Sequence, residues 1–241
     1  MPADKKPAPS VWTRPSRPQR EQLTREQIVT AAIELLDSEG TEALSMRRLG
    51  SRLGAGATSL YRHVANRDEL IQLVVDDVYG ELDLPTTAER SRWRATATRI
   101  AADLRAMTLR HPWIATELGQ VGLVHIGPNA MRMTSALLAQ FEAAGFPAQE
   151  RERAGGTLTA YVIGIAISEA AYLSLIAASG QSEQEWVASL RPDYEETAPP
   201  EPRRRDADST QPQSDPQQIR DADFSYGLER VLDGLAARLN A

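Results

Sequence analysis

Arginine, serine and histidine side chains follow closely after the glycine-containing stretch 54–56. The guanidinium group of Arg62 can donate two hydrogen bonds to O6 and N7 of a guanine, and the methyl group of Ala57 could contact the methyl group of a thymine. Each of these side chains on its own is more simply interpreted as part of a solvated surface. Their position relative to the surrounding helices is what favours contact with DNA.

Two short helices are predicted on either side of this stretch. The first spans 45–53, with Ser45 as its N-cap. Its inward-facing residues are Met46, Leu49 and Leu53. The second spans 57–64 and buries Leu60 and Val64, which are four positions apart. This leaves four positions accessible: Ala57, Ser59, Arg62 and His63. Two such helices joined by a tight turn are typical of a helix-turn-helix, whose second helix enters the major groove of DNA.

Longer helices are predicted before and after this pair. Residues 24–27, Thr-Arg-Glu-Gln, form a capping box, and apolar residues then follow at helical spacing as far as Gly40. A second capping box at 66–69, Asn-Arg-Asp-Glu, begins a helix that extends to about Gly80. We therefore place a DNA-binding domain, built on three helices, over 21–80.

The rest of the chain also has helical periodicity. Apolar residues recur at helical spacing in four segments: 93–107, 128–145, about 150–178 and 224–239. No segment alternates with a period of two, so the predicted fold class is all-α. Residues 191–220 hold six prolines and predict a disordered or mobile loop within a helical domain over 81–241. Residues 1–20, with five prolines and five Lys or Arg, predict a flexible basic arm.

Composition narrows the function classes. The net charge of the 241 residues is −6, but residues 1–67 carry eleven Lys or Arg against seven Asp or Glu. This asymmetry hints at a nucleic-acid-binding end on an acidic body. The absence of cysteine excludes disulfides, thiolate metal sites and cysteine nucleophiles. No apolar run approaches the roughly 20 residues that span a bilayer, so we expect a cytoplasmic protein without a membrane partner.

Over its helix-turn-helix region the chain resembles the tetracycline-repressor (TetR/AcrR) family of transcriptional regulators. The matching residues are 28–40, Leu44-Ser45-Met46-Arg47-Arg48-Leu49, Leu60-Tyr61-Arg62-His63-Val64, Asn66-Arg67 and Glu69-Leu70. The resemblance implies binding to a double-stranded DNA operator. It implies phosphate contacts by Ser45, Arg47, Thr58, Tyr61, His63 and Arg67. It also implies that three residues face base edges: Ala57, Ser59 and Arg62. Because Gly56 and Ala57 are small, base contacts are expected to be sparse.

The C-terminal part is similar to the ligand-sensing half of the same family. The residues that carry this similarity are Arg110-His111-Pro112-Trp113, Gly127-Pro128-Asn129, Ala144-Gly145-Phe146, 161–169 and 224–228. The similarity implies a homodimer sealed by four helices, with Gly155, Gly156 and Gly164 allowing close approach. The candidate interface residues are Leu158, Val162, Ile165, Leu228, Val231, Leu232 and Leu235.

The same similarity implies a small-molecule effector of unknown identity within the helical body. The candidate contacts are Trp93, Leu104, Met107, Trp113, His125, Met133, Leu137, Phe141 and Tyr172, which suggest an apolar or aromatic effector. Each of the apolar and aromatic ones is more simply interpreted as core packing than as a ligand contact. His125 lies at a position similar to that at which the tetracycline repressor binds its drug-bound metal. A lone histidine before a glycine is more often structural, so neither a metal nor another cofactor is predicted.

The predicted function is a ligand-responsive repressor. Two other function classes are alternatives to it. A DNA-binding regulator controlled by a protein partner would have an exposed apolar groove in place of an internal cavity. An enzyme is the more distant alternative. The chain has three widely separated histidines and no cysteine, so no nucleophile–base pair can be named.

Overall fold

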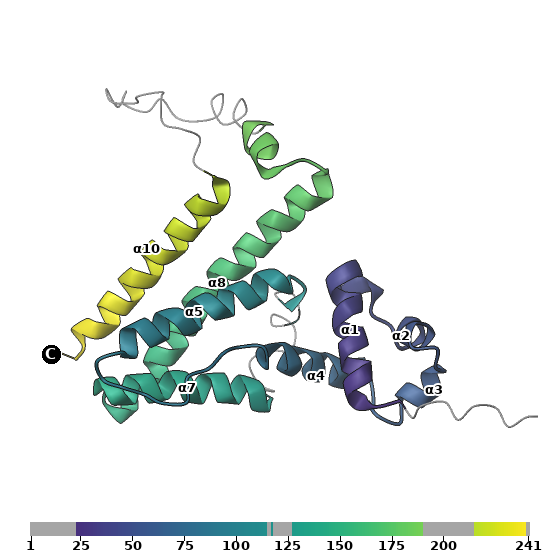
Figure 1. The fold of residues 1–241 in the computed structure, drawn as a ribbon, viewed down its shortest axis with the longest axis horizontal. Coiled ribbons are helices and arrows are strands. Elements are labelled where there is room, and N and C mark those ends of the chain that lie inside the picture. Colours follow the sequence, from purple (N-terminus) through teal and green to yellow (C-terminus); the bar gives the residue numbers. More distant parts are fainter. Residues whose placement is uncertain (1–22, 115–116, 118–126, 190–214, 240–241) are drawn as a thin grey trace, which may run out of the picture.

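The computed structural model describes residues 23–114, 117, 127–189 and 215–239, and over these ranges it contains helices and no strand (Figure 1). The elements are α1 (Arg25–Glu39), the 3₁₀ helix η2 (Thr41–Ala43), α2 (Met46–Arg52), α3 (Ala57–Leu60), α4 (Arg67–Tyr79), α5 (Trp93–Arg110), α7 (Pro128–Ala144), α8 (Ala148–Ser179) and α10 (Pro216–Ala237). Residues 183–189 are also helical. The all-α fold class is confirmed. In Figure 1, α1, α2 and α3 form a small unit, called the head here; α5, α7, α8 and α10 form the body, and α4 lies between them.

The head begins with the caps that the sequence predicts. The Thr24 hydroxyl accepts the backbone N–H of Gln27 at 3.2 Å, and the Gln27 side chain accepts the backbone N–H of Thr24 at 3.0 Å. Ser45 caps α2 by accepting the N–H of Arg48 at 3.2 Å. The core behind these helices consists of residues at most 2% exposed: Ile28, Ala32, Leu35, Leu36, Leu49, Leu60, Leu70, Ile71 and Val74. The core holds α2 and α3 against α1 and α4 and leaves their outer faces in solvent.

The second helix of the pair is shorter than predicted. The sequence predicts a helix over 57–64, whereas α3 ends at Leu60. The N–H of His63 donates to the carbonyl of Leu60 at 2.9 Å, an i→i+3 bond that tightens the backbone into a turn. Asn66 then caps α4 with its side chain. Val64 is still buried, at 1% exposure, so the predicted inward face is confirmed although the helix ends earlier.

The start of α7 is capped by a carboxylate from α4. Gly127, the N-cap residue of α7, has no side chain to offer. Asp76 takes this role, because its Oδ1 accepts the backbone N–H groups of Asn129 at 2.9 Å and Ala130 at 3.1 Å. A Cβ atom at position 127 would lie 2.3 Å from the Asp76 carboxylate. Glycine at this position therefore lets α4 hold the beginning of α7.

Asp76→Ala is expected to lower the free energy of unfolding by about 1–2 kcal/mol, because two N–H groups at the start of α7 lose their acceptor. Asp77 is the matched control. Burial, with repulsion from Glu81 and Asp76, raises the pKa of Asp77. The folded protein therefore binds a proton at Asp77 more tightly than the unfolded chain does, and the ionised carboxylate at pH 7 destabilises the fold.

Asp77→Ala is accordingly expected to leave stability unchanged or raise it slightly. Urea unfolding of both variants at pH 7 measures the difference. An equal loss of stability in the two variants would contradict the capping role of Asp76.

The body is organised around α8, which packs against α5, α7 and α10. Three aromatic rings from α5 and the end of α7 meet beside it. The rings of Phe141 and Phe146 meet edge to face with centroids 5.0 Å apart, and the ring of Trp93 lies 6.0 and 5.7 Å from them. As predicted, α7 ends at Gly145, whose φ of 100° reverses the chain and brings Phe146 back onto Phe141.

The packing of α10 on α8 depends on a glycine. The Tyr161 hydroxyl donates to the Phe224 carbonyl at 2.8 Å, and the two rings are stacked with centroids 6.0 Å apart. A Cβ atom on Gly227 would lie 2.2 Å from that hydroxyl oxygen. Gly227 thus allows the two helices to approach closely enough for this hydrogen bond.

α10 begins inside the range where a loop was predicted. The expected loop over 191–220 extends too far, because Pro216 occupies the first turn of α10 and Asp215 accepts the N–H of Gln217 at 3.1 Å. A proline without an N–H is well suited to this position, so the last proline of the run marks a helix start. The remainder of the predicted loop, at 191–214, and the predicted arm at 1–20 lie outside the described residues.

α8 is apolar enough, by length and composition alone, to cross a membrane: its mean hydropathy reaches 1.7 over an 18-residue window. The sequence analysis had expected no such run. In the structure this helix packs against three neighbours, and Glu169 in its second half is paired with arginines of α5 and α10. Only 28% of that apolar window is buried within the chain, so packing inside the body accounts for one face of α8 and leaves an apolar face accessible.

Candidate nucleic-acid interface

Most of the residues predicted to contact DNA lie on α2 and α3 or within three residues of their ends. Five are exposed: Ser45, Arg47, Thr58, Tyr61 and Arg62. Three are partly exposed: Ala57, Ser59 and His63. The most informative is Tyr61, because 52% of a large aromatic side chain lies in solvent. Eight of the predicted contacts are therefore accessible to a ligand outside the head.

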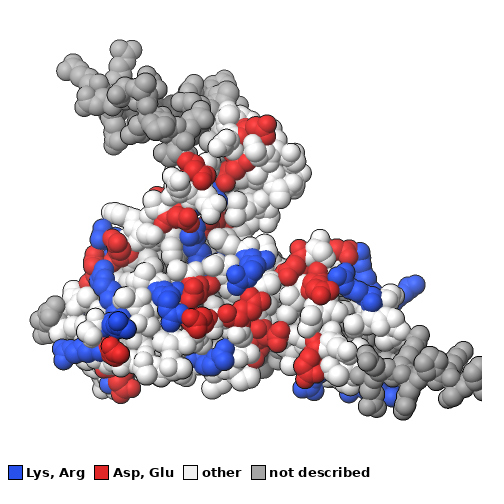
Figure 2. Space-filling view, in the orientation of Figure 1, with Lys and Arg blue, Asp and Glu red and all other residues white. Residues whose placement is uncertain are grey.

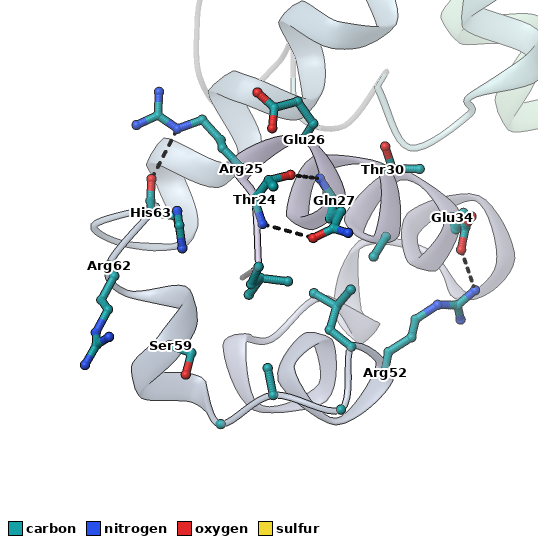
Figure 3. Close-up of a pocket in the computed structure, with 16 residues that line it drawn as sticks. Thr24, Arg25, Glu26, Gln27, Thr30, Glu34, Arg52, Ser59, Arg62 and His63 are labelled. Carbon is teal, nitrogen blue, oxygen red and sulfur yellow. Dashed lines mark hydrogen bonds and ion pairs between the residues drawn. The ribbon is translucent and has the colours of Figure 1, made fainter. Parts of the chain in front are cut away.

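The start of α1 contributes a residue that the sequence analysis missed. Nε of Arg25 donates to the carbonyl of His63 at 3.3 Å, which ties α1 to the turn after α3 (Figure 3). In the same view Arg62 extends away from the head, with no labelled side chain in front of it. Arg25 was interpreted only as part of a capping box, and its long-range contact has no local signal in the sequence.

A groove of about 1400 Å³ lies between the start of α1 and the turn that joins α2 to α3 (Figure 3). Its walls include Ser59 and Arg62 as well as Arg52, which pairs with Glu34 at 3.0 Å. Pockets for small molecules are mostly apolar and enclosed, whereas this groove is open and has several charged side chains along it. It is therefore part of the polar surface around α3 and does not have the character of an effector cavity.

Arg47 and Arg62 differ from the other arginines of the helix-turn-helix. Within the described part of the chain neither of them forms an ion pair, whereas Arg48 and Arg52 pair with Glu39 and Glu34 of α1. Figure 2 shows basic side chains projecting from the head end of the molecule, while acidic and basic side chains alternate over the body. Two arginines of the head thus keep their charge available for an anionic partner.

Arg67, to which the resemblance assigns a phosphate contact, also contacts the body. Its Nη2 lies 3.4 Å from Oε1 of Glu117 and 3.5 Å from the carbonyl of Thr41. The Glu117 side chain is only 3% exposed. A carboxylate that is this deeply buried needs a cationic partner, and Arg67 supplies it.

The predicted effector contacts are mainly core residues. Six of them are at most 4% exposed: Leu104, Met107, Trp113, Met133, Leu137 and Phe141. Two of the predicted effector contacts have carboxylate neighbours. Trp113 donates its Nε1–H to Asp37 of α1 at 2.6 Å, so it belongs to the contact between body and head. Tyr172 lies beside Glu183, and burial together with that carboxylate raises the pKa of its hydroxyl. His125 lies outside the described residues, and over the described ranges no group of three or more His, Asp or Glu could hold a metal ion.

A buried ion-pair network, which the sequence analysis missed, joins three helices of the body. Arg105 of α5 donates to both carboxylate oxygens of Glu169 on α8 at 2.7 Å, and Arg220 of α10 donates to the same carboxylate at 2.9 Å. The side chains of Arg105, Glu169 and Arg220 are 11%, 7% and 19% exposed. The only sequence signal was a lone glutamate in an apolar helix, which must be paired if it is buried.

A cavity of about 370 Å³ lies beside this network, between α5 and α10. The arginines on its walls are already paired, Arg105 with Glu169 and Arg94 with Asp233 at 2.6 Å. None of the predicted effector contacts lines it. Its walls therefore bear no arginine that is free of an ion pair among the described residues.

The predicted interface residues divide into buried and accessible ones. Leu158, Val162, Leu228 and Leu232 are at most 2% exposed within the single chain. They pack α8 and α10 into the chain's own core, so they cannot form a surface that a partner covers. Val231 and Leu235 are partly buried, and Ile165 is 38% exposed. Gly155, assigned to the same interface, faces α7, where its Cβ would lie 3.2 Å from Leu138.

The chain matches two family descriptions that together cover both units. Residues 28–74 match "Bacterial regulatory proteins, tetR family", and residues 84–239 match "Tetracyclin repressor-like, C-terminal domain". The first region contains the helix-turn-helix with α2 and α3, and the second contains the helices of the body.

Curated relatives and solved structures agree with these matches. An HTH-type transcriptional regulator of Saccharopolyspora erythraea is 41% identical over 165 residues, which are 68% of this chain and 69% of that protein. The HTH-type transcriptional repressor DrrR1 of Streptomyces coeruleorubidus is 31% identical over 92% of this chain and 80% of that protein. The structure of the Streptomyces coelicolor TetR family protein ActR in complex with actinorhodin has a TM-score of 0.70 and 30% identity, over 90% of this chain and 97% of that one.

Proposed function

The chain belongs to the tetR family of bacterial regulatory proteins, and from this we propose that it represses transcription as a homodimer that binds a near-palindromic operator and is released by a small aromatic effector. It is a helix-turn-helix DNA-binding regulator and not an enzyme. The observation that carries the proposal is the exposed set of arginine, hydroxyl and aromatic side chains on α2 and α3.

DNA binding is supported by the chemistry of that surface. Arg47 and the Ser45 hydroxyl lie at the start of α2, where they can hold phosphate groups, and Arg62 extends from the end of α3, where it can reach a guanine. Because the base-facing residues Ala57 and Ser59 are small, the sequence preference of one head rests mainly on Arg62. Two heads related by a two-fold axis would then recognise a near-palindrome.

A homodimer is supported by the accessible faces of α8 and α10. Gly164 and Gly156 on α8 and Gly234 on α10 are exposed, and no described atom lies within 4 Å of the position that a Cβ would occupy on any of them. A glycine inside a helix is unfavourable by about 1 kcal/mol relative to alanine, and packing within the protomer does not require these three. Close approach of a partner helix explains them. Together with Ile165 and Leu175 they replace the buried leucines as the proposed contact surface.

The effector class is inferred from a relative. ActR, which shares the fold over nearly its whole length, has been solved with actinorhodin. The body of this chain places the rings of Trp93, Phe141 and Phe146 together beside apolar side chains of α5 and α7. Phe141 and Phe146 are at most 1% exposed and pack against each other, so these rings belong to the core, and the ligand of the relative is what supports an aromatic effector. Titration of the operator complex with actinorhodin, followed by the anisotropy of labelled DNA, tests this class; an effector-type molecule should release the DNA at a concentration that leaves the circular dichroism unchanged.

Arg62→Ala is expected to weaken binding to the cognate operator by about 1–3 kcal/mol per half-site while leaving binding to random DNA nearly intact. Arg47→Ala, the matched comparison on the other helix, should weaken both kinds of DNA and reduce the salt slope by about one unit. Fluorescence anisotropy with selected and random duplexes between low and moderate salt gives both quantities. Equal losses on the two duplexes for Arg62→Ala would show that Arg62 does not read a base.

A further inference from the structure

The head is attached to the body at a second place besides α4. Asp37, in the last turn of α1, accepts the Nε1–H of Trp113 at 2.6 Å, and its Oδ1 lies 2.7 Å from Nδ1 of His111. We propose that this contact, called the α1 joint here, is a positioning device that sets the spacing between the two DNA-reading heads. The inference rests on the proposed function, because the distance between two heads affects binding only if a dimer binds two half-sites.

The α1 joint brings together several ionisable side chains. His111 is only 6% exposed, and its two ring nitrogens face two carboxylates, Asp37 at 2.7 Å and Glu81 at 3.1 Å. Each ring nitrogen is therefore within hydrogen-bonding distance of a carboxylate oxygen. His111 directly follows α5, and its backbone N–H donates to the carbonyl of Met107 at the end of that helix. The remaining charge at this place is Arg110, which donates to Glu81 at 2.8 Å.

The position of Asp37 is not explained by the needs of α1. An acidic side chain in the last turn of a helix faces the negative end of the helix dipole, which is unfavourable. The carboxylate gains its partners from residues 74 and 76 positions further along the chain. The position of Asp37 is therefore explained by its contacts with the body and not by the stability of α1.

Two attachments restrain the head more than one does. α4 is held by the body through Asp76 at the start of α7, and a head held by α4 alone could still turn about the axis of that helix. The α1 joint lies on a different helix of the head, beside the end of α5 (Figure 1). With both contacts made, turning the head requires the Asp37 contacts to break. The joint thus fixes the direction in which α3 points, and in a dimer it fixes the distance between the two α3 elements.

The test is the dependence of binding on half-site spacing. The operator selected from random DNA by the wild-type protein is lengthened or shortened by one or two base pairs at its centre. Wild-type protein should lose about a hundredfold or more in affinity when the spacing is wrong, because both heads can no longer engage. Asp37→Ala should reduce this loss to less than about tenfold while preferring the same half-site sequence. Asp37→Asn, which keeps an oxygen for Trp113, should retain an intermediate preference.

The matched control is Glu39→Ala. Glu39 is in the same turn of α1, but it pairs with Arg48 inside the head, so its removal should leave the spacing preference as in the wild type. If Asp37→Ala fails to fold, the spacing dependence of Trp113→Phe tests the inference instead. This variant removes one donor to Asp37 and keeps an aromatic ring in the core. The inference is overturned if these variants lose affinity equally at every spacing, as a purely structural role requires. Wild-type protein with no spacing preference at all would overturn the proposed dimeric recognition, and the joint with it.

Discussion

Glu169→Ala is expected to lower the free energy of unfolding by about 2–3 kcal/mol, because Arg105 and Arg220 lose their shared carboxylate and keep only Asp221 and Glu183 as partners. Glu169 accepts two hydrogen bonds from Arg105 at 2.7 Å and a further one from Arg220 at 2.9 Å. These bonds raise the pKa of Arg105, so that side chain stays charged at every accessible pH. It cannot escape the loss of its partner by losing its proton.

Glu150→Ala is the matched control, because Glu150 is also a glutamate of α8 and it pairs with an arginine directly after α10. Its bond to Arg238, at 2.7 Å, lies at the surface, and the Arg238 side chain is 60% exposed. Exposed pairs contribute about 0–1 kcal/mol, so this variant should be close to the wild type. Urea unfolding of both variants measures the contrast. Similar losses for Glu169→Ala and Glu150→Ala would mean that solvent compensates the arginines and that the network is not a stabilising centre of the body.

Gly164→Arg is expected to convert the dimer into monomers and to lower operator affinity by about 10²–10⁴-fold, because two linked heads bind far more tightly than one. No described atom lies within 4 Å of the Cβ position of Gly164, so the protomer has room for the longer side chain. In the proposed dimer that side chain would instead project into the partner helix. The loss of affinity would therefore come from assembly and not from the fold.

Ser135→Arg provides the control for added charge, because Ser135 is an exposed small residue on α7, away from α8 and α10. It should remain dimeric and keep its operator affinity. Sedimentation at micromolar concentration gives the oligomeric state, and circular dichroism confirms that each variant is folded. If Gly164→Arg sedimented as a dimer with normal operator affinity, the proposed contact surface on α8 would be wrong.

The elements that could be predicted from the sequence depend on short-range interactions. The capping box at 24–27 and the N-cap at Ser45 mark the starts of α1 and α2, and Gly145 marks the end of α7. Each of these signals involves groups within about four positions along the chain, so a short window contains the whole interaction. The same holds for the inward spacing of Leu60 and Val64, which placed the accessible residues of the helix-turn-helix correctly.

The sequence analysis did not find the contacts that depend on a partner far away along the chain. Arg67 has the right type and position for a phosphate contact, but a buried carboxylate 50 positions away attracts it. Trp113 was assigned to the effector site by its apolar character, and its indole N–H is held by Asp37 of the head. Leu228 and Leu232 form an amphipathic stripe that fits a partner subunit as well as it fits α8 and α5 of the same chain. Periodicity identifies a face that will be buried, and it does not say what will cover that face.

By itself the sequence determined the all-α class, the starts and ends of most helices and the helix-turn-helix with its accessible arginines, because backbone capping and hydrophobic periodicity are written in neighbouring residues. The tertiary structure alone decided which charges remain available for a partner and which hold the molecule together. Arg62 and Arg105 are the same residue type, yet one extends from the end of α3 and the other is 11% exposed between α5 and α8. That difference follows from how distant helices pack, since the burial and pairing of a charge depend on every element around it.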